Sequence, residues 1–302
     1  SSRATIQGPI VKNKSSFIIS SRRTYIDILS KPFLKDDMKG NGYYFYDLTA
    51  KANYKFSDKD RLYLSGYFGR DVFNFSSSNT SFGIEIPWGN TTASLRWNHL
   101  FNDKLFLNTS IIYSDYLFEL GMEQSQFEFK LSTSITDWNT KIDFTYLPNL
   151  RNSIKFGTQY TYHTFIPASV SGRSGEVSFV PETIFKQYAN ECSLYFSDDY
   201  ELTDRIKINM GGRYTVFQHD GYISIKDMIN NEFTQETESQ YRHFEPRFSA
   251  RYSINPTTSF KSSFTQNYQY IHLASLGGMS MPMDLWLPSS SIIKPTKGEQ
   301  YT

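Results

Sequence analysis

The sequence predicts an all-β protein, an antiparallel up-and-down β-barrel that crosses a membrane with strands. Apolar and polar side chains alternate along runs of about 10 to 20 residues, as in strands with two different faces. Aromatic residues make up 17% of the 302 residues, and no run reaches the roughly 18 apolar residues that a transmembrane helix requires. Because all-β barrels routinely exceed about 200 residues as one unit, we expect residues 1–302 to form one transmembrane barrel domain.

The alternation is clearest in residues 44–56. The apolar face is formed by Tyr44, Tyr46, Leu48, Ala50, Ala52, Tyr54 and Phe56, and the polar face by Asp47, Thr49, Lys51, Asn53 and Lys55. Residues 205–217 and 247–254 repeat the pattern, and 260–268 form a further strand with Tyr268 on the apolar face. Weaker alternation predicts strands at about 15–28, 61–73, 81–101, 105–118, 125–147, 152–165 and 188–202. The total is about a dozen strands.

The connections between these segments are of two kinds that take turns along the chain. Short polar turns, rich in the Asn, Asp and Pro that tight turns favour, are predicted at 57–60, 102–104, 148–152, 203–204 and 255–257. Longer segments lie at about 29–42, 74–80, 119–124, 166–187, 219–242 and 271–293. An antiparallel meander with short turns at one rim and long loops at the other is typical of bacterial outer-membrane barrels, with periplasmic turns and extracellular loops.

A soluble β-sandwich or β-propeller is the alternative, because a sheet with one solvated face shows the same alternation. The lengths of the runs argue against it, since globular strands usually have about 5 or 6 residues. Segments 81–101 and 125–147 exceed even the roughly 9 to 11 residues that cross a bilayer. We therefore expect them to project beyond the outer leaflet, as the walls of a large barrel do.

Composition excludes several classes of function. With 31 basic and 30 acidic side chains the formal net charge is +1, so nucleic acid is not an expected partner. The five histidines lack close ligand spacing, and the single Cys192 cannot build a thiolate site, so we expect no metal and no cofactor. Cys192 shares a face with Leu194 and Phe196, which predicts a lipid-facing, unreactive thiol.

Several segments resemble TonB-dependent receptors of the Bacteroidota type. The resemblance runs through residues 2–10, 12–20, 22–25, 155–157, 246–252, 263–269, 284–290 and 293–295. Its most specific pieces are the Gly8-Pro9-Ile10 hairpin near the start and the Asp284-Leu285-Trp286-Leu287-Pro288 loop near the end.

The resemblance implies a barrel of about 22 strands, so that about 12 strands would form a central slice, with the plug domain and the TonB box outside this chain. It also implies the outer membrane of a Gram-negative bacterium and a function in import rather than catalysis. A scarce ligand such as a siderophore, cobalamin, glycan or peptide would bind the extracellular loops and the plug. The implied partners are outer-membrane lipid and the inner-membrane TonB complex, which pulls on the plug.

Two other functions remain open at this point. A passive porin or an adhesin uses a similar barrel. An outer-membrane hydrolase would need a nucleophile with a histidine base, a role that His163 or His272 near a strand end could fill. No catalytic residue is predicted, because the sequence shows no acid partnered with either histidine.

Two groups of residues are candidates for binding. The loop at 277–286 gathers Met281, Met283 and Trp286, soft and aromatic side chains of the kind that bind ligands, at the expected outer rim. An ordinary packed loop is the alternative. Arg22, Arg23 and Arg213 are candidates for contact with the lumen or plug, and one of the first two must face inward because neighbours alternate. Ion pairing with lumenal Asp and Glu is the alternative for such residues.

Overall fold

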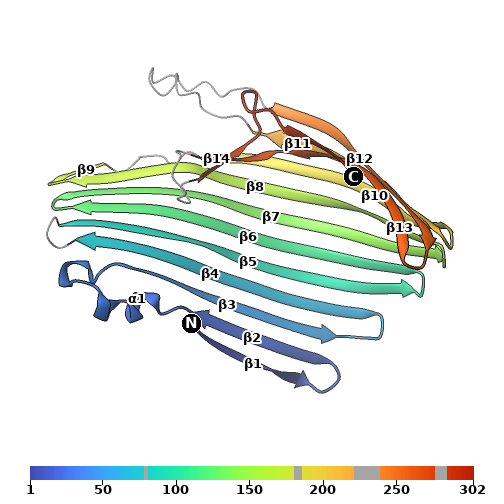
Figure 1. Cartoon of the computed structure of the whole chain (residues 1–302), viewed down its shortest axis with the longest axis horizontal. Helices are drawn as coiled ribbons and strands as arrows, with labels where there is room; N and C mark the ends of the chain where they lie inside the picture. Colours follow the sequence, from blue (N-terminus) through green and yellow to red (C-terminus); the bar gives the residue numbers. More distant parts are fainter. Residues whose placement is uncertain (78–80, 180–185, 221–238, 276–283) are drawn as a thin grey trace.

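The computed structural model describes residues 1–77, 81–179, 186–220, 239–275 and 284–302. Within them one antiparallel sheet of 14 strands runs in the order β1 to β8, β10 to β13 and then β16, with β9 added to β8. β14 and β15 form a separate two-stranded sheet. Nearly every strand therefore pairs with its neighbour in the sequence (Figure 1), and the predicted all-β, up-and-down architecture is confirmed.

The sheet begins with β1 (Ser2–Val11), β2 (Ser15–Arg23), β3 (Gly42–Lys55), β4 (Asp60–Ser77), β5 (Phe82–Asn102), β6 (Leu105–Gln124) and β7 (Phe127–Asn149). It continues with β8 (Asn152–Ser174), β9 (Val177–Phe179), β10 (Gln187–Thr203), β11 (Ile206–His219), β12 (Ser239–Asn255), β13 (Thr258–Gln269) and β16 (Thr296–Tyr301). The remaining elements are α1 (Ile26–Leu29), the 3-10 turns η1 (Lys31–Phe33) and η2 (Asp36–Met38), β14 (Ile271–Ser275) and β15 (Asp284–Pro288).

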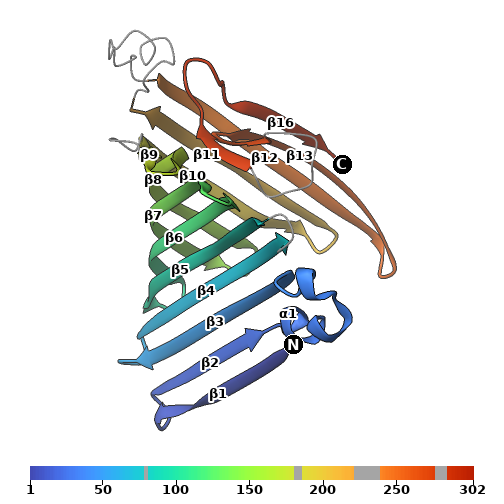
Figure 2. The ribbon, with the colours of Figure 1, turned by 90° about the vertical axis from the view of Figure 1, so that its left-hand side faces the viewer.

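The sheet curls into an open trough rather than a closed barrel. Figures 1 and 2 show β12, β13 and β16 turning over the concave side of the middle strands, while β1 and β16 form the two outer edges. No helix in the described part of the chain is long and apolar enough to cross a membrane.

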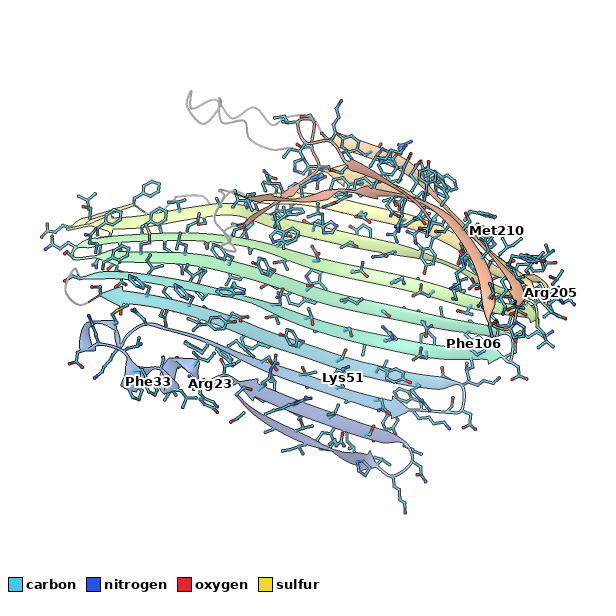
Figure 3. The ribbon with its side chains drawn as sticks, in the orientation of Figure 1. Arg23, Phe33, Lys51, Phe106, Arg205 and Met210 are labelled. Carbon is cyan, nitrogen blue, oxygen red and sulfur yellow. The ribbon has the colours of Figure 1, made fainter. Side chains whose placement is uncertain are left out.

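The two faces of the sheet differ in polarity, as the alternation predicts. On the convex side Ala52, Leu64, Leu95 and Ile111 lie in one row across β3 to β6, and Leu64 is 55% exposed. The concave side carries Lys51, labelled in Figure 3, and other polar side chains. An apolar exterior around a polar interior is the arrangement of a transmembrane barrel.

Two rows of aromatic side chains border the apolar exterior. The upper row, toward the long loops, contains Tyr46, Phe68, Tyr113, Trp138 and Tyr160, and the lower row, toward the short turns, contains Tyr54, Trp97, Phe144, Phe156 and Tyr252. Some neighbours within a row touch, with ring centroids 5.0 Å apart for Tyr113 and Trp138 and 5.1 Å for Phe144 and Phe156. Such girdles mark the two interfaces of a bilayer in outer-membrane barrels.

Beyond the upper aromatic row the convex face becomes charged. Glu119 accepts ion pairs from Lys130 at 2.7 Å and Arg70 at 3.6 Å, all on the outward side of β4, β6 and β7. Charged side chains are costly in hydrocarbon and ordinary in water. The upper row therefore separates an apolar zone from a hydrated one.

The short turns owe their geometry to one side-chain oxygen each. Asn102, Asn149 and Thr203 accept hydrogen bonds from the backbone amides two and three residues ahead. Ser57 does the same for Lys59 and Asp60. Since these bonds replace backbone pairing at the reversal, Asn, Ser and Thr at these positions fix where each strand ends.

Several predicted boundaries are wrong at the long-loop rim. β6 and β8 continue to Gln124 and Ser174, where loops were predicted from 119 and 166. Only short alternation is left in these strand ends, with Leu120 and Met122 in β6 and Ile166 and Val170 in β8, although the backbone pairing continues. At the end of β2, Thr24 instead bonds Phe45 through its backbone and side chain, and the strand stops at Arg23 rather than 28.

Tyr268 also departs from its predicted face. Pairing between β12 and β13 ends at Arg247 and Thr265, and beyond that point β13 pairs only with β16 on its other side. Tyr268 then packs against the buried cluster on the concave side. The strands β14 and β15, inside a predicted loop, and β16 were not predicted.

An added positive charge should destabilise the protein much more on the convex face of the sheet than on the concave face. Leu64→Lys places an ammonium in the middle of the apolar exterior, whereas Asn53→Lys places it in the concavity that Asn53 lines. We expect the first to destabilise the folded protein in bilayers by about 2–4 kcal/mol and the second by much less. Urea unfolding of the complete gene product in lipid vesicles measures both, and equal losses would contradict the assignment of the faces.

Candidate functional site

The concave side of the trough is partly covered by a hairpin that folds back from the long-loop rim. Its strands β14 and β15 pair from Ile271 and Pro288 to Ser275 and Asp284, and β15 lies against β7 and β8. Figure 1 shows it inside the curve made by β8 and β11 to β13. We call β14 and β15 the inner hairpin.

The inner hairpin sits on the main buried apolar cluster among the described residues. Phe165 of β8, Ala189 of β10 and Phe217 of β11 are fully buried there with Tyr270, whose ring stacks on Phe217 at 4.9 Å. Ile271 and Trp286 of the hairpin pack against this cluster. Burial of these rings is the main apolar contribution that holds the hairpin against the wall.

Hydrogen bonds hold the base of the inner hairpin, where its two strands join the rest of the chain. The Tyr241 hydroxyl donates to the carbonyl of Ser290 at 2.7 Å, and the amide of Ser289 donates to the carbonyl of Tyr270 at 2.7 Å. His272 Nε2 lies 2.8 Å from the hydroxyl of Ser289. Burial lowers the pKa of His272 below its ordinary value of 6.5, because the charged ring would lose hydration.

A polar cluster lies beside the hairpin on the inner face of β8 and β10 to β12. Its members are His163, Glu191, Arg213, Thr215 and Glu245. The guanidinium of Arg213 is 3.4 Å from Glu191 Oε1, and its Nε is 3.4 Å from the hydroxyl of Thr215. Thr215 in turn donates to Glu245 at 3.1 Å. We call this group the inner polar cluster.

The arginines in and beside the inner polar cluster face carboxylates, and His163 lies between two more carboxylate contacts. His163 Nδ1 is 2.7 Å from Asp137, and its Nε2 is 4.0 Å from Glu191. Arg247 lies 3.9 Å from Glu245. Because the cationic side chains face carboxylates of the wall, this arrangement stabilises neighbouring strands and orients donors, and it does not present an unsatisfied cation to an anionic ligand.

A separate concavity runs along the inner face of β1 to β5, toward the short-turn rim. Its volume is about 1040 Å³, and Lys51, Asn53, Ser65, Arg96 and Asn98 are among its lining residues. Its inner wall is polar and open, which suits contact with another polar protein segment or solvent more than an apolar small molecule. Within the described residues, no group of three His, Cys, Asp or Glu side chains could hold a metal ion.

The candidate ligand-binding residues fall in different places. Trp286 was expected on an outer-rim loop, but it lies in the inner hairpin, with its ring edge-on to Tyr116 of β6 at 6.2 Å. Its indole Nε1 is buried without a hydrogen-bond partner in the described part of the chain. Met281 and Met283 lie outside the described residues.

The candidate arginines occupy both faces. Arg22 pairs across the sheet with Asp47 and forms an ion pair with it at 2.7 Å on the concave side. Arg23 lies on the convex side, where it contacts Asp27 and the ring of Tyr44. Arg213 belongs to the inner polar cluster. Of the neighbouring pair, Arg22 is therefore the one that faces the lumen.

The histidines considered as bases do not assemble a hydrolytic site. His272 contacts Ser289, but that serine is fully buried beneath the hairpin and cannot reach a substrate. His163 has the carboxylate partner Asp137, and its Nε2 lies 4.0 Å from the carboxylate of Glu191, while the hydroxyl of Thr215 donates to Glu245. Among the described residues, His163 thus faces carboxylates on both ring nitrogens, and the hydroxyl beside His272 is buried.

Sequence reasoning missed the residues that receive the hairpin. They come from four different segments: Tyr116 from β6, Glu191 from β10, Tyr241 and Glu245 from β12, and Tyr270 from the link between β13 and β14. Alternation could place those in strands on the inner face, but the turn of chain that brings Tyr270 and Trp286 inward leaves no periodic signal.

Comparison with known proteins gives one family. A family model described as TonB dependent receptor-like, beta-barrel, matches residues 24–302. No curated protein matches the sequence.

Several solved structures with the same fold are named as receptors for ferric ligands. The ferric yersiniabactin uptake receptor of Yersinia pestis superposes with a TM-score of 0.67 at 12% identity, covering 99% of this chain and 48% of the other. The ferric preacinetobactin receptor of Acinetobacter baumannii superposes with a TM-score of 0.64 at 10% identity, covering 99% of this chain and 48% of the other. The ferric-catecholate import receptor of E. coli superposes with a TM-score of 0.65 at 10% identity, covering 99% of this chain and 53% of the other. The chain thus spans about half the length of these structures, and at this identity the similarity concerns the fold.

The lowered pKa of His272 predicts that acid loosens the inner hairpin. The docked hairpin favours the neutral ring, whereas an undocked hairpin binds a proton at about pH 6.5. Docking is therefore fully stable above pH 6.5 and weakens as the pH falls through that value, until the docked ring also becomes protonated. Hydrogen-exchange protection of β14 and β15, corrected for intrinsic rates, should fall between pH 7.5 and about 5.5. His272→Gln should remove this dependence, and equal protection at both pH values in the unaltered protein would refute it.

Proposed function

This chain belongs to the family of TonB-dependent receptor-like β-barrels, and on that premise we propose that it is the central part of an outer-membrane receptor that imports a scarce ligand. The family consists of receptors and transporters rather than enzymes. The convex face would lie in the outer membrane of a Gram-negative bacterium, with the short turns in the periplasm and the long loops outside. The Gly8-Pro9-Ile10 hairpin and the Asp284 to Pro288 segment motivate the further proposal of a Bacteroidota-type receptor.

The observation that carries this proposal is the inner hairpin. It brings aromatic side chains from the long-loop rim into the lumen and holds them on a buried platform. A receptor needs a fixed surface on which to capture its ligand before transport, and the aromatic side chains held on this platform supply one. Transport would then need energy from the TonB complex, acting through a plug outside this chain.

The ligand is proposed as a siderophore, cobalamin, a glycan or a peptide. The names of the similar structures, which are receptors for ferric siderophores, make ferric siderophores the first class to test. Arg22 and Arg213, on the concave side, remain proposed contacts of the plug. Arg23 on the convex side is better suited to the neighbouring segment described below.

Energy coupling distinguishes this function from passive diffusion. We expect uptake of radiolabelled ferric siderophores, cobalamin or oligosaccharides by cells that carry the complete gene product to stop when a protonophore collapses the inner-membrane potential. A strain without the gene is the control. Uptake that continues unchanged in the presence of the protonophore, together with steady conductance in planar bilayers, would indicate a porin.

A substitution of Trp286 tests whether the ligand binds at the inner hairpin. Trp286→Ala removes the largest ring of the inner hairpin, and we expect the ligand affinity of the complete gene product to fall by about tenfold or more, as for an aromatic anchor. Trp138→Ala, on the exposed convex face, is the matched control and should leave affinity unchanged. If both variants bind the transported ligand as tightly as the original protein, Trp286 has no part in capture.

A further inference from the structure

The connection between β2 and β3 exposes an unusual amount of apolar surface. This segment, residues 24–41, contains α1, η1 and η2, and we call it the strap. Ile26 is 55% exposed, Leu29 66% and Phe33 90%. Apolar side chains gathered on the surface of a polar loop normally mark a site that lipid or another molecule covers.

The strap lies on the convex side of the sheet. A Cβ at Gly42, which would point outward from β3, would come within 3.0 Å of Asp27, and one at Gly40 would meet Ser76 of β4. Arg23, on the convex side, forms an ion pair with Asp27 at 3.3 Å. Figure 3 labels Arg23 and Phe33 on this part of the chain, near the end of β2. The strap therefore rests outside the lumen, on β3 and β4.

The strap also sits at the level of the upper aromatic row. The guanidinium of Arg23 lies over the rings of Tyr25 and Tyr44, at 5.4 and 5.3 Å. Tyr44 in turn stacks on Tyr46 of that row, with ring centroids 6.4 Å apart. The exposed apolar side chains of the strap are thus continuous with the apolar exterior, just where the convex face changes from apolar to charged.

We propose that the strap is an interfacial membrane anchor, with Ile26, Leu29 and Phe33 inserted into the outer leaflet of the lipid that surrounds the barrel. The exposed Lys31 and Lys35 flank Phe33 and can reach phosphates at the headgroup level, as long basic side chains do at membrane interfaces. Continuity with the lipid-facing exterior favours lipid over a second copy of the chain as the occupant. This inference rests on the proposed function, because it requires the convex face to lie in a membrane.

Spin labels can place the strap relative to the lipid. Cys192, exposed on the convex face among apolar neighbours, provides the lipid reference without substitution. Phe33→Cys in a Cys192→Ala background tests the strap, and Val177→Cys in β9, 74% exposed near the end of the long β8 wall, is the reference for water. Because all these positions are exposed, labels there disturb no packing.

The complete gene product, labelled with a nitroxide and reconstituted in phosphatidylglycerol and phosphatidylethanolamine vesicles, is then exposed to oxygen and to a water-soluble nickel chelate. We expect the label at residue 33 to respond to oxygen more than to nickel, as at Cys192, and the label at 177 to do the reverse. A nickel response at 33 equal to that at 177, or shielding from both reagents by a second copy, overturns the anchor. If the label at Cys192 also responds mainly to nickel, the membrane barrel of the proposed function fails instead.

Discussion

Backbone pairing between long neighbouring strands is the constraint on which the rest of this structure depends. The sheet is a single layer, and the main apolar cluster in the described residues is the small one beneath the inner hairpin. In lipid an unpaired amide or carbonyl costs several kcal/mol, so consecutive strands stay paired over lengths that reach 23 residues in β7 and β8, with register shifts only near Ser132 and Tyr146 in that pair. The paired backbone fixes which side chains face outward, and between the two aromatic rows the outward positions are mostly apolar while the inward ones are mostly polar.

The two connections for which we propose a function depend on this sorting, and they leave the same rim in opposite directions. The inner hairpin turns inward because the concave side offers the buried platform of Phe165, Ala189 and Phe217. The strap turns outward because Arg23 and Asp27 hold it against the convex side of β3. A capture surface and an anchor would thus be placed on either side of one wall.

The sequence predicts the barrel wall well and its rim poorly. Alternation locates β3, β5, β7, β10 and β11 to within about two residues, since their outward positions are apolar and their inward positions polar. It fails at the long-loop ends of β6 and β8, where the alternation is short and the strands continue to Gln124 and Ser174, and where pairing is lost, as at Tyr268. It also fails for Trp286, since the residues that receive it, such as Tyr116 and Tyr270, are close to it only in the folded protein.

The central claim is that lipid, and not a second layer of protein, covers the convex face. A cryo-electron microscopy map of the complete gene product in a lipid nanodisc tests it most directly. The account predicts a single closed barrel in which β1 and β16 each pair with further strands, with the lipid belt between the upper and lower aromatic rows. A map in which protein packs over Leu64, Leu95 and Ile111, or in which the lipid belt misses both rows, would contradict it.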